Sequence, residues 1–180
     1  DEETLGPLLE EICPRPRWEQ YGAAGDIDFA YAMGEASRFR CNYYRQQFGH
    51  GAVFRVIPTK ILSLEQLNAP PVITQIAEIQ SGLILVTGPT GSGKSTTLAA
   101  VLNHINENYA RKILTLEDPV EFVHPSKRSI FTQREVGEDT ESFATGLRAG
   151  TREDCNVILV GEMRDLETIS LAISAAETGV

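Results

Sequence analysis

A glycine-rich segment in the middle of the chain constrains the fold more than any other feature. It reads Gly-Pro-Thr-Gly-Ser-Gly-Lys-Ser over residues 88–95 and directly follows the apolar run at 83–86. This is the G-x-x-x-x-G-K-S pattern of a phosphate-binding loop, which needs a buried strand before it and a helix after it. A strand-to-helix turn without a ligand is the simpler interpretation, but the sequence and its context together favour a nucleotide site.

Each residue type in this loop suits a phosphate chain. Glycines let backbone N–H groups point inward at a phosphate, and the N-terminus of the following helix favours negative charge. Lys94 brings a positive charge to the β- and γ-phosphates, and Ser95 offers a hydroxyl to Mg²⁺. The residues predicted to bind a nucleoside triphosphate are Gly88, Pro89, Thr90, Gly91, Ser92, Gly93, Lys94, Ser95 and Thr96.

Composition narrows the class of protein. The 180 residues carry a formal net charge of −9, which disfavours a nucleic acid or anionic membrane partner. No apolar stretch reaches the roughly 18 residues of a membrane span, and the N-terminus lacks the pattern of a signal peptide. The three cysteines are widely separated, which favours reduced thiols in a cytosolic protein, and the three histidines form no metal-binding pattern.

The chain divides into two unequal parts. In the first, an amphipathic pattern predicts a short helix that ends near Pro14, and alternating residues predict antiparallel strands at 27–31, 37–43 and 52–57. In the second, strands are expected at 83–87, 112–117, 128–132 and 157–161, and helices at 72–80, 94–108, 140–150 and 166–177. Apolar strands that alternate with helices indicate a parallel α/β sheet. We therefore predict an N-terminal domain at 1–69, a linker and leading helix at 70–81, and a nucleotide-binding core at 82–180.

Acidic residues follow two of the predicted parallel strands. Glu117, Asp118 and Glu121 come at and after the strand 112–117, where ligands of open α/β sheets bind. A glutamate there can orient the water that attacks a phosphate, although a solvated acidic turn is the alternative. Glu162 follows the apolar run 157–160, a pattern that brings a carboxylate to Mg²⁺ but is weak in isolation.

These motifs together resemble the secretion-type ATPases of type IV pili and type II secretion, and within them the twitching-motility retraction ATPases. The resemblance lies in residues 82–100, 113–127, 132–154 and 157–179, and 37–67 resembles half of the family's PAS-like domain. It implies a RecA-like P-loop NTPase core with a mostly parallel, C-terminally truncated sheet. A partial, antiparallel PAS-like α+β domain would precede that core.

The resemblance also implies roles for single residues. Glu121 would be the catalytic glutamate, Glu117 would line the same acidic box, and Glu162 would support Mg²⁺. Arg40 and Arg55 match arginines that the family brings to the γ-phosphate, where they stabilise developing charge. The simpler interpretation of either arginine is a solvated residue of a sheet.

By this resemblance the chain is part of an Mg-dependent ATPase that forms a homohexameric ring and powers pilus retraction. Its partner would be a platform protein of the inner membrane, reached from the cytoplasm through peripheral association. The family continues beyond residue 180 with a histidine-bearing box, so we expect a fragment. Alternatives are a pilus-extension or type II secretion ATPase, an accessory retraction paralogue, a non-hydrolysing nucleotide-binding module and a DNA-translocating ring ATPase.

Overall fold

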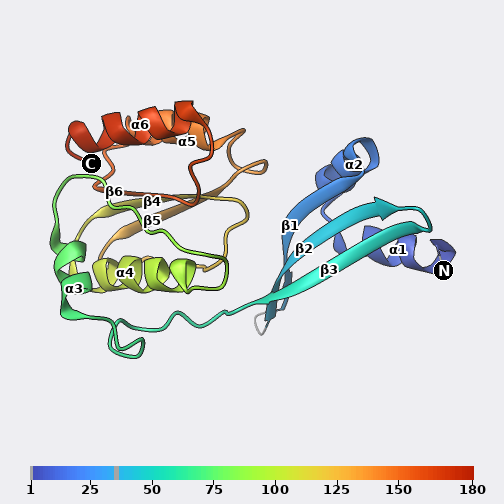
Figure 1. Cartoon of the computed structure of the whole chain (residues 1–180), viewed down its shortest axis with the longest axis horizontal. Helices are drawn as coiled ribbons and strands as arrows, with labels where there is room; N and C mark the ends of the chain where they lie inside the picture. The colour runs from blue at the N-terminus through green and yellow to red at the C-terminus, as the bar shows by residue number, and fades with distance from the viewer. Residues whose placement is uncertain (1, 35–36) are drawn as a thin grey trace. The chain divides into compact units, whose positions relative to one another are not determined.

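The computed structural model describes residues 2–34 and 37–180 and contains two compact units that divide after Thr59. The first unit has two helices followed by an antiparallel sheet of order β1-β2-β3 (Figure 1). Its elements are α1 (Glu2–Ile12), α2 (Arg15–Ala24), β1 (Asp26–Met33), β2 (Ser37–Gln46) and β3 (Gly49–Ile57). The structure contains antiparallel strands at the three places where the alternating sequence pattern predicts them.

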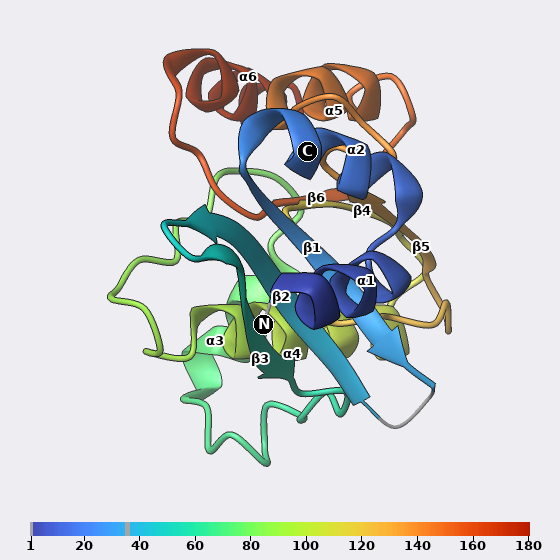
Figure 2. The ribbon, with the colours of Figure 1, turned by 90° about the vertical axis from the view of Figure 1, so that its right-hand side faces the viewer.

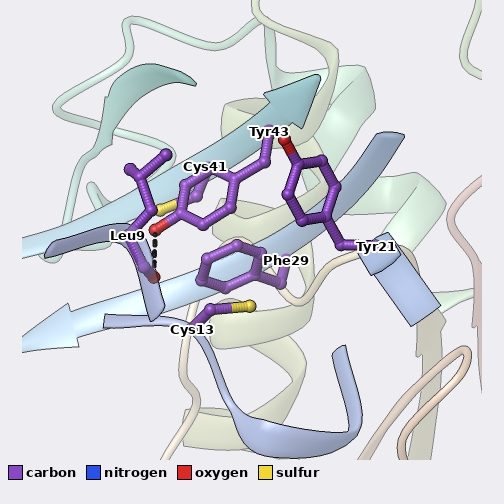
Figure 3. Packing of buried hydrophobic residues seen from close by; sticks show 6 residues of the cluster. All are labelled: Leu9, Cys13, Tyr21, Phe29, Cys41 and Tyr43. Atoms are coloured by element: carbon purple, nitrogen blue, oxygen red, sulfur yellow. Dashed lines mark hydrogen bonds between the residues drawn. The ribbon is translucent and has the colours of Figure 1, made fainter. Parts of the chain in front are cut away.

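The core of the first unit lies between α1, α2 and one face of the sheet (Figures 1 and 3). Its buried members come from both helices, from the turn between them and from β1 and β2: Leu9, Cys13, Tyr21, Phe29, Cys41 and Tyr43. The hydroxyl of Tyr43 donates a hydrogen bond to the carbonyl oxygen of Leu9 at 3.2 Å, so the one polar atom of this buried ring is satisfied (Figure 3).

Helix α2 is not expected from the sequence, where prolines near residue 14 indicate the end of a helix. In the structure they begin a second one. Pro14 is the N-cap residue, and the proline that follows occupies the first turn, where its missing N–H costs nothing. Gly25 ends α2 in the left-handed conformation, with a φ of 86°.

The second unit is a three-layer α/β structure with a parallel sheet of order β5-β4-β6. Helices α3 and α4 cover one face of the sheet, and α5 and α6 cover the other (Figures 1 and 2). Its elements are α3 (Pro71–Glu78), α4 (Lys94–Asn108), β4 (Lys112–Glu117), β5 (Ile130–Glu135), α5 (Phe143–Gly150), β6 (Val157–Val160) and α6 (Leu166–Glu177). The predicted α/β fold class is confirmed.

Strand β4 is the buried centre of this sheet. Ile113 points to one face, where it packs against side chains of α3 and α4. Leu114 and Leu116 cluster with buried residues of α5 and α6. All three have no exposed surface, which explains why a central parallel strand reads as a continuous apolar run.

The strand predicted at 83–87 is wrong. In the part of the chain that the structure describes, residues 83–87 form no strand and pair with none of β4, β5 and β6. The side chains from Leu83 to Val86 are 39–62% exposed, so this segment is not enclosed as a central strand is. The prediction relied on apolar composition, but an apolar run becomes a central strand only when neighbouring strands and both helix layers enclose it.

Within the described residues, no helix is both long enough and apolar enough to cross a membrane.

Candidate nucleotide site

The phosphate loop has the backbone conformation that its glycines predict. Gly88, Gly91 and Gly93 have φ angles of 151°, 80° and 91°, a region in which side chains with a Cβ are strained. Gly93 is also the N-cap residue of α4, so the loop leads directly into a helix N-terminus. The unpaired N–H groups there and the helix dipole suit a phosphate.

The amine of Lys94 closes this loop. Its Nζ donates to the carbonyl oxygens of Gly88 at 2.8 Å and Pro89 at 2.9 Å. Two carbonyl oxygens of the loop therefore hold the cation at the loop. Ser95 is exposed in the first turn of α4 and Thr96 is half-buried beside it. These donors fit a nucleoside triphosphate, with the Ser95 hydroxyl available to its Mg²⁺.

The acidic residues lie at the same edge of the second unit as this loop. Helix α4 ends at Asn108, and β4 begins at Lys112 and runs back in the opposite direction. The N-terminus of α4 and the carboxyl end of β4 therefore share one edge of the sheet (Figure 1). This is the edge at which open α/β sheets bind ligands.

The structure brings Glu117 and Glu121 together. Glu117 ends β4, and its Oε2 accepts the backbone N–H of Glu121 at 3.3 Å. Its Oε1 accepts hydrogen bonds from the hydroxyl of Thr115 at 2.7 Å and the amide of Gln133 at 3.3 Å. Burial raises the pKa of Glu117, and these hydrogen bonds oppose that rise.

Glu121 differs from Glu117 in its position. It is half-buried on the segment 118–124, which begins with an exposed Asp118 and a cis bond to Pro119. Both carboxylate oxygens of Glu117 serve groups of the protein. Glu117 is thus a support for the segment, and Glu121 is the better candidate for contact with water and substrate.

Glu162 follows the neighbouring strand β6. Gly161, which precedes it, donates its N–H to the Leu116 carbonyl oxygen at 2.8 Å. A Cβ at Gly161 would lie 3.1 Å from that oxygen, a tight contact, so the close approach of the two backbones favours glycine. This docking fixes the residue before Glu162 against the end of β4. The carboxylate of Glu162 pairs with Arg164 at 2.8 Å.

No group of three or more metal-ligating side chains occurs among the residues that the structure describes. Mg²⁺ bound with a nucleotide commonly takes most of its ligands from phosphate and water and only one or two from the protein, and Ser95 and Glu162 have the oxygen donors that it prefers. Their role as magnesium ligands stays a prediction.

Arg40 and Arg55 lie in the first unit. They are directly opposite each other on β2 and β3, and Arg40 pairs with Asp28 at 3.5 Å. Like charges directly opposite on a sheet are unfavourable, so this arrangement needs a compensating anion. Asp28 supplies one. Their action on a nucleotide in the second unit stays a prediction.

Comparisons with known proteins show the family of the chain. Residues 24–180 match the family model described as "Type II/IV secretion system protein". The chain belongs to this family. It is 51% identical over 177 residues to a twitching motility protein of Neisseria gonorrhoeae, covering 98% of this chain and 47% of that protein. It is 54% identical over 172 residues to the type IV pilus retractation ATPase PilT of Pseudomonas aeruginosa, covering 96% and 50%.

A solved structure shows the same fold. The crystal structure of the pilus retraction motor PilT with bound ADP superposes with a TM-score of 0.91 at 45% identity, covering 97% of this chain and 51% of that one. The expected resemblance to the secretion-type ATPases is confirmed. This member of the type II/IV secretion system family spans about half the length of the relatives it matches.

Sequence reasoning missed the residues that support the acidic segment in this family member. Thr115 and Gln133 bond the Glu117 carboxylate, and Glu135 accepts the Val120 N–H at 3.0 Å. The signal that could identify them is the parallel register, which pairs Thr115 with Gln133 and Glu117 with Glu135.

Proposed function

We propose that this chain is the ATP-hydrolysing part of a motor that powers pilus retraction. The observation that carries the proposal is the shared edge of the second unit, where the Lys94-closed phosphate loop and the carboxyl ends of β4 and β6 lie together. A phosphate-binding loop alone would serve any nucleotide-binding protein. The glutamates at the same edge supply what hydrolysis needs in addition.

Each residue has a chemical role in this proposal. The loop N–H groups and Lys94 bind the phosphates, and Ser95 and Glu162 would hold Mg²⁺, which would withdraw charge from the phosphate oxygens. Glu121 orients the attacking water and accepts its proton. Glu117 holds the backbone of Glu121 in place. Arg40 and Arg55 approach the γ-phosphate of a nucleotide and stabilise the charge that develops there.

The relatives suggest the work that hydrolysis drives. Relatives at 51% and 54% identity are named as a twitching motility protein and a pilus retraction ATPase. We infer that the protein works as a homohexameric ring at the cytoplasmic face of the inner membrane, on a platform protein of the pilus machine. A pilus-extension or type II secretion ATPase remains the alternative within the family, and a non-hydrolysing nucleotide-binding module the alternative outside it.

Nucleotide binding tests the first step. Lys94→Ala removes the cation from the loop, so affinity for a fluorescent ATP analogue should fall by about 100-fold or more. Lys60→Ala removes an equal charge at an exposed site outside the loop and is the matched control. Unchanged affinity in Lys94→Ala would refute the assignment of the loop.

A chimaera tests the retraction function. This chain would replace the matching half of the Pseudomonas aeruginosa retraction ATPase, to which it is 54% identical. In cells that lack that ATPase, the chimaera should restore surface spreading, and the same chimaera with Lys94→Ala should not. A chimaera that is stable and hydrolyses ATP but restores no spreading would favour the extension or secretion alternative.

A further inference from the structure

The side-chain amide of Gln133 makes hydrogen bonds with three groups around Glu121. Gln133 lies on β5, directly opposite Thr115 of β4. Its Oε1 accepts the backbone N–H of His124 at 2.7 Å. Its Nε2 donates to the carbonyl oxygen of Phe122 at 2.8 Å and to Oε1 of Glu117 at 3.3 Å. Both hydrogens of the amide and its oxygen are therefore used.

These partners fix the orientation of the amide. The His124 N–H can only donate, and the Phe122 carbonyl and the Glu117 carboxylate can only accept. Rotation of the amide by half a turn would place its NH₂ group against the His124 N–H, which is also a donor. Its oxygen would then face the Phe122 carbonyl and the Glu117 carboxylate, which are also acceptors. Gln133 thus fits this position in one orientation, and an amide is the group that can serve both kinds of partner.

The contacted groups surround Glu121 in the chain. Phe122 follows Glu121 directly and His124 is three residues after it, while Glu117 accepts the N–H of Glu121 itself at 3.3 Å. Gln133 therefore holds the backbone after Glu121 directly and the backbone at Glu121 through the carboxylate. The side chains of Phe122 and His124 are buried, so the segment is also anchored by packing on either side of this amide.

We propose that Gln133 is a positioning residue, which sets the backbone from which Glu121 reaches its water and does not itself touch the nucleotide. This inference rests on the proposed function, because Glu121 needs a set position only if it acts on ATP. A displacement of about 1 Å at such a group can lower a rate by about 100-fold. Loss of the Gln133 amide should therefore lower the turnover rate and leave the affinity for ATP unchanged.

Kinetics test the role. Gln133→Met keeps the length of the side chain and removes its hydrogen bonds. We expect kcat for Mg-ATP to fall by about 10-fold to 100-fold, with KM within about twofold. Gln66→Met is the matched control, because the Gln66 amide bonds Ser63 on an exposed turn away from the site. A kcat equal to that of the unaltered chain would overturn the inference. A rise in KM by the same factor as the fall in kcat would overturn it as well.

A pH profile separates positioning from a general loss of structure. Gln133→Glu keeps the acceptor for the His124 N–H but faces the Glu117 carboxylate with a second carboxylate. Two such groups share a proton as the pH falls, which restores a donor. The kcat of this variant, relative to the unaltered chain, should rise by about 10-fold between about pH 8 and about pH 6. A flat ratio would contradict the proposed contact.

Amide hydrogen exchange distinguishes a failure of this inference from a failure of the proposed function. In Gln133→Met the N–H groups of Glu121 and His124 should exchange at least about 10-fold faster, while that of Leu114 in the core of β4 stays protected. Unchanged exchange would overturn the inference even if turnover fell. If the unaltered chain binds ATP without turnover, the proposed function fails, and exchange alone decides whether Gln133 sets the segment.

Discussion

The ring of His124 gives a prediction of how stability depends on pH. This side chain is 8% exposed, stacks on Phe131 with ring centroids 4.4 Å apart, and has no hydrogen-bond partner at Nδ1. Burial, together with a smaller effect of the nearby Lys127 charge, lowers its pKa from 6.5 to about 4. The folded protein therefore keeps His124 neutral where the unfolded chain already binds a proton.

The sign and size follow from linkage. A pKa that is lower in the folded state contributes stability that is complete above the unfolded value of 6.5 and is lost as the pH falls toward 4. The loss approaches about 1.4 kcal/mol per pH unit, so between about pH 7 and about pH 5 it amounts to about 2 kcal/mol. His124→Phe removes this term and keeps an aromatic ring against Phe131.

The assay is urea denaturation at the two pH values. Unfolding is monitored through the NMR methyl signals of Leu114 and Leu116, which report on the second unit. The unaltered chain should lose about 2 kcal/mol more than His124→Phe on acidification. Glu117, whose raised pKa acts with the opposite sign, is present in both proteins and cancels in the difference. His104→Phe, at a half-buried site on α4, is the control that retains His124. Equal losses in His124→Phe and the unaltered chain would refute the reasoning.

Three further substitutions test other parts of the account. Glu121→Gln should retain ATP affinity but cut turnover by about 10²–10⁴-fold, and normal turnover in a single-turnover assay would move the role elsewhere. Leu114→Ala opens a cavity in the fully buried centre of β4 and should cost about 3 kcal/mol in urea denaturation, against less than about 1 for the exposed Leu166→Ala. Asn106→Leu removes two bonds that dock residues 125–127 on α4, so exchange of the Lys127 N–H should accelerate, and unchanged protection would contradict that contact.

Local signals were sufficient to predict the helices that surround the site. The predicted bounds 94–108 and 166–177 coincide with α4 and α6. Each helix begins after a residue type that is favoured at the N-cap. Gly93 is the N-cap of α4, and Asp165 is the N-cap of α6, where its side chain accepts the N–H of Thr168. The buried strand β4 was equally predictable, because its apolar run is enclosed on both faces.

Features that depend on tertiary contacts were not predictable from one sequence. The segment 83–87 has the composition of a strand, but composition does not reveal whether neighbouring strands enclose it. Gln133 is 16 residues from Glu117, and only the parallel register of β4 and β5 places their side chains together. The sequence likewise identified the acidic residues without showing that Glu117 supports the backbone of Glu121.

The most direct test of the proposed motor is specific Mg-ATP hydrolysis measured against protein concentration, with Lys94→Ala alongside. If a neighbouring subunit completes the site, activity per chain should climb with concentration and vanish in Lys94→Ala. Activity that is constant per chain would contradict a shared site. Tight binding of ATP with no turnover at any concentration would contradict the proposed hydrolysis and leave a nucleotide-binding module.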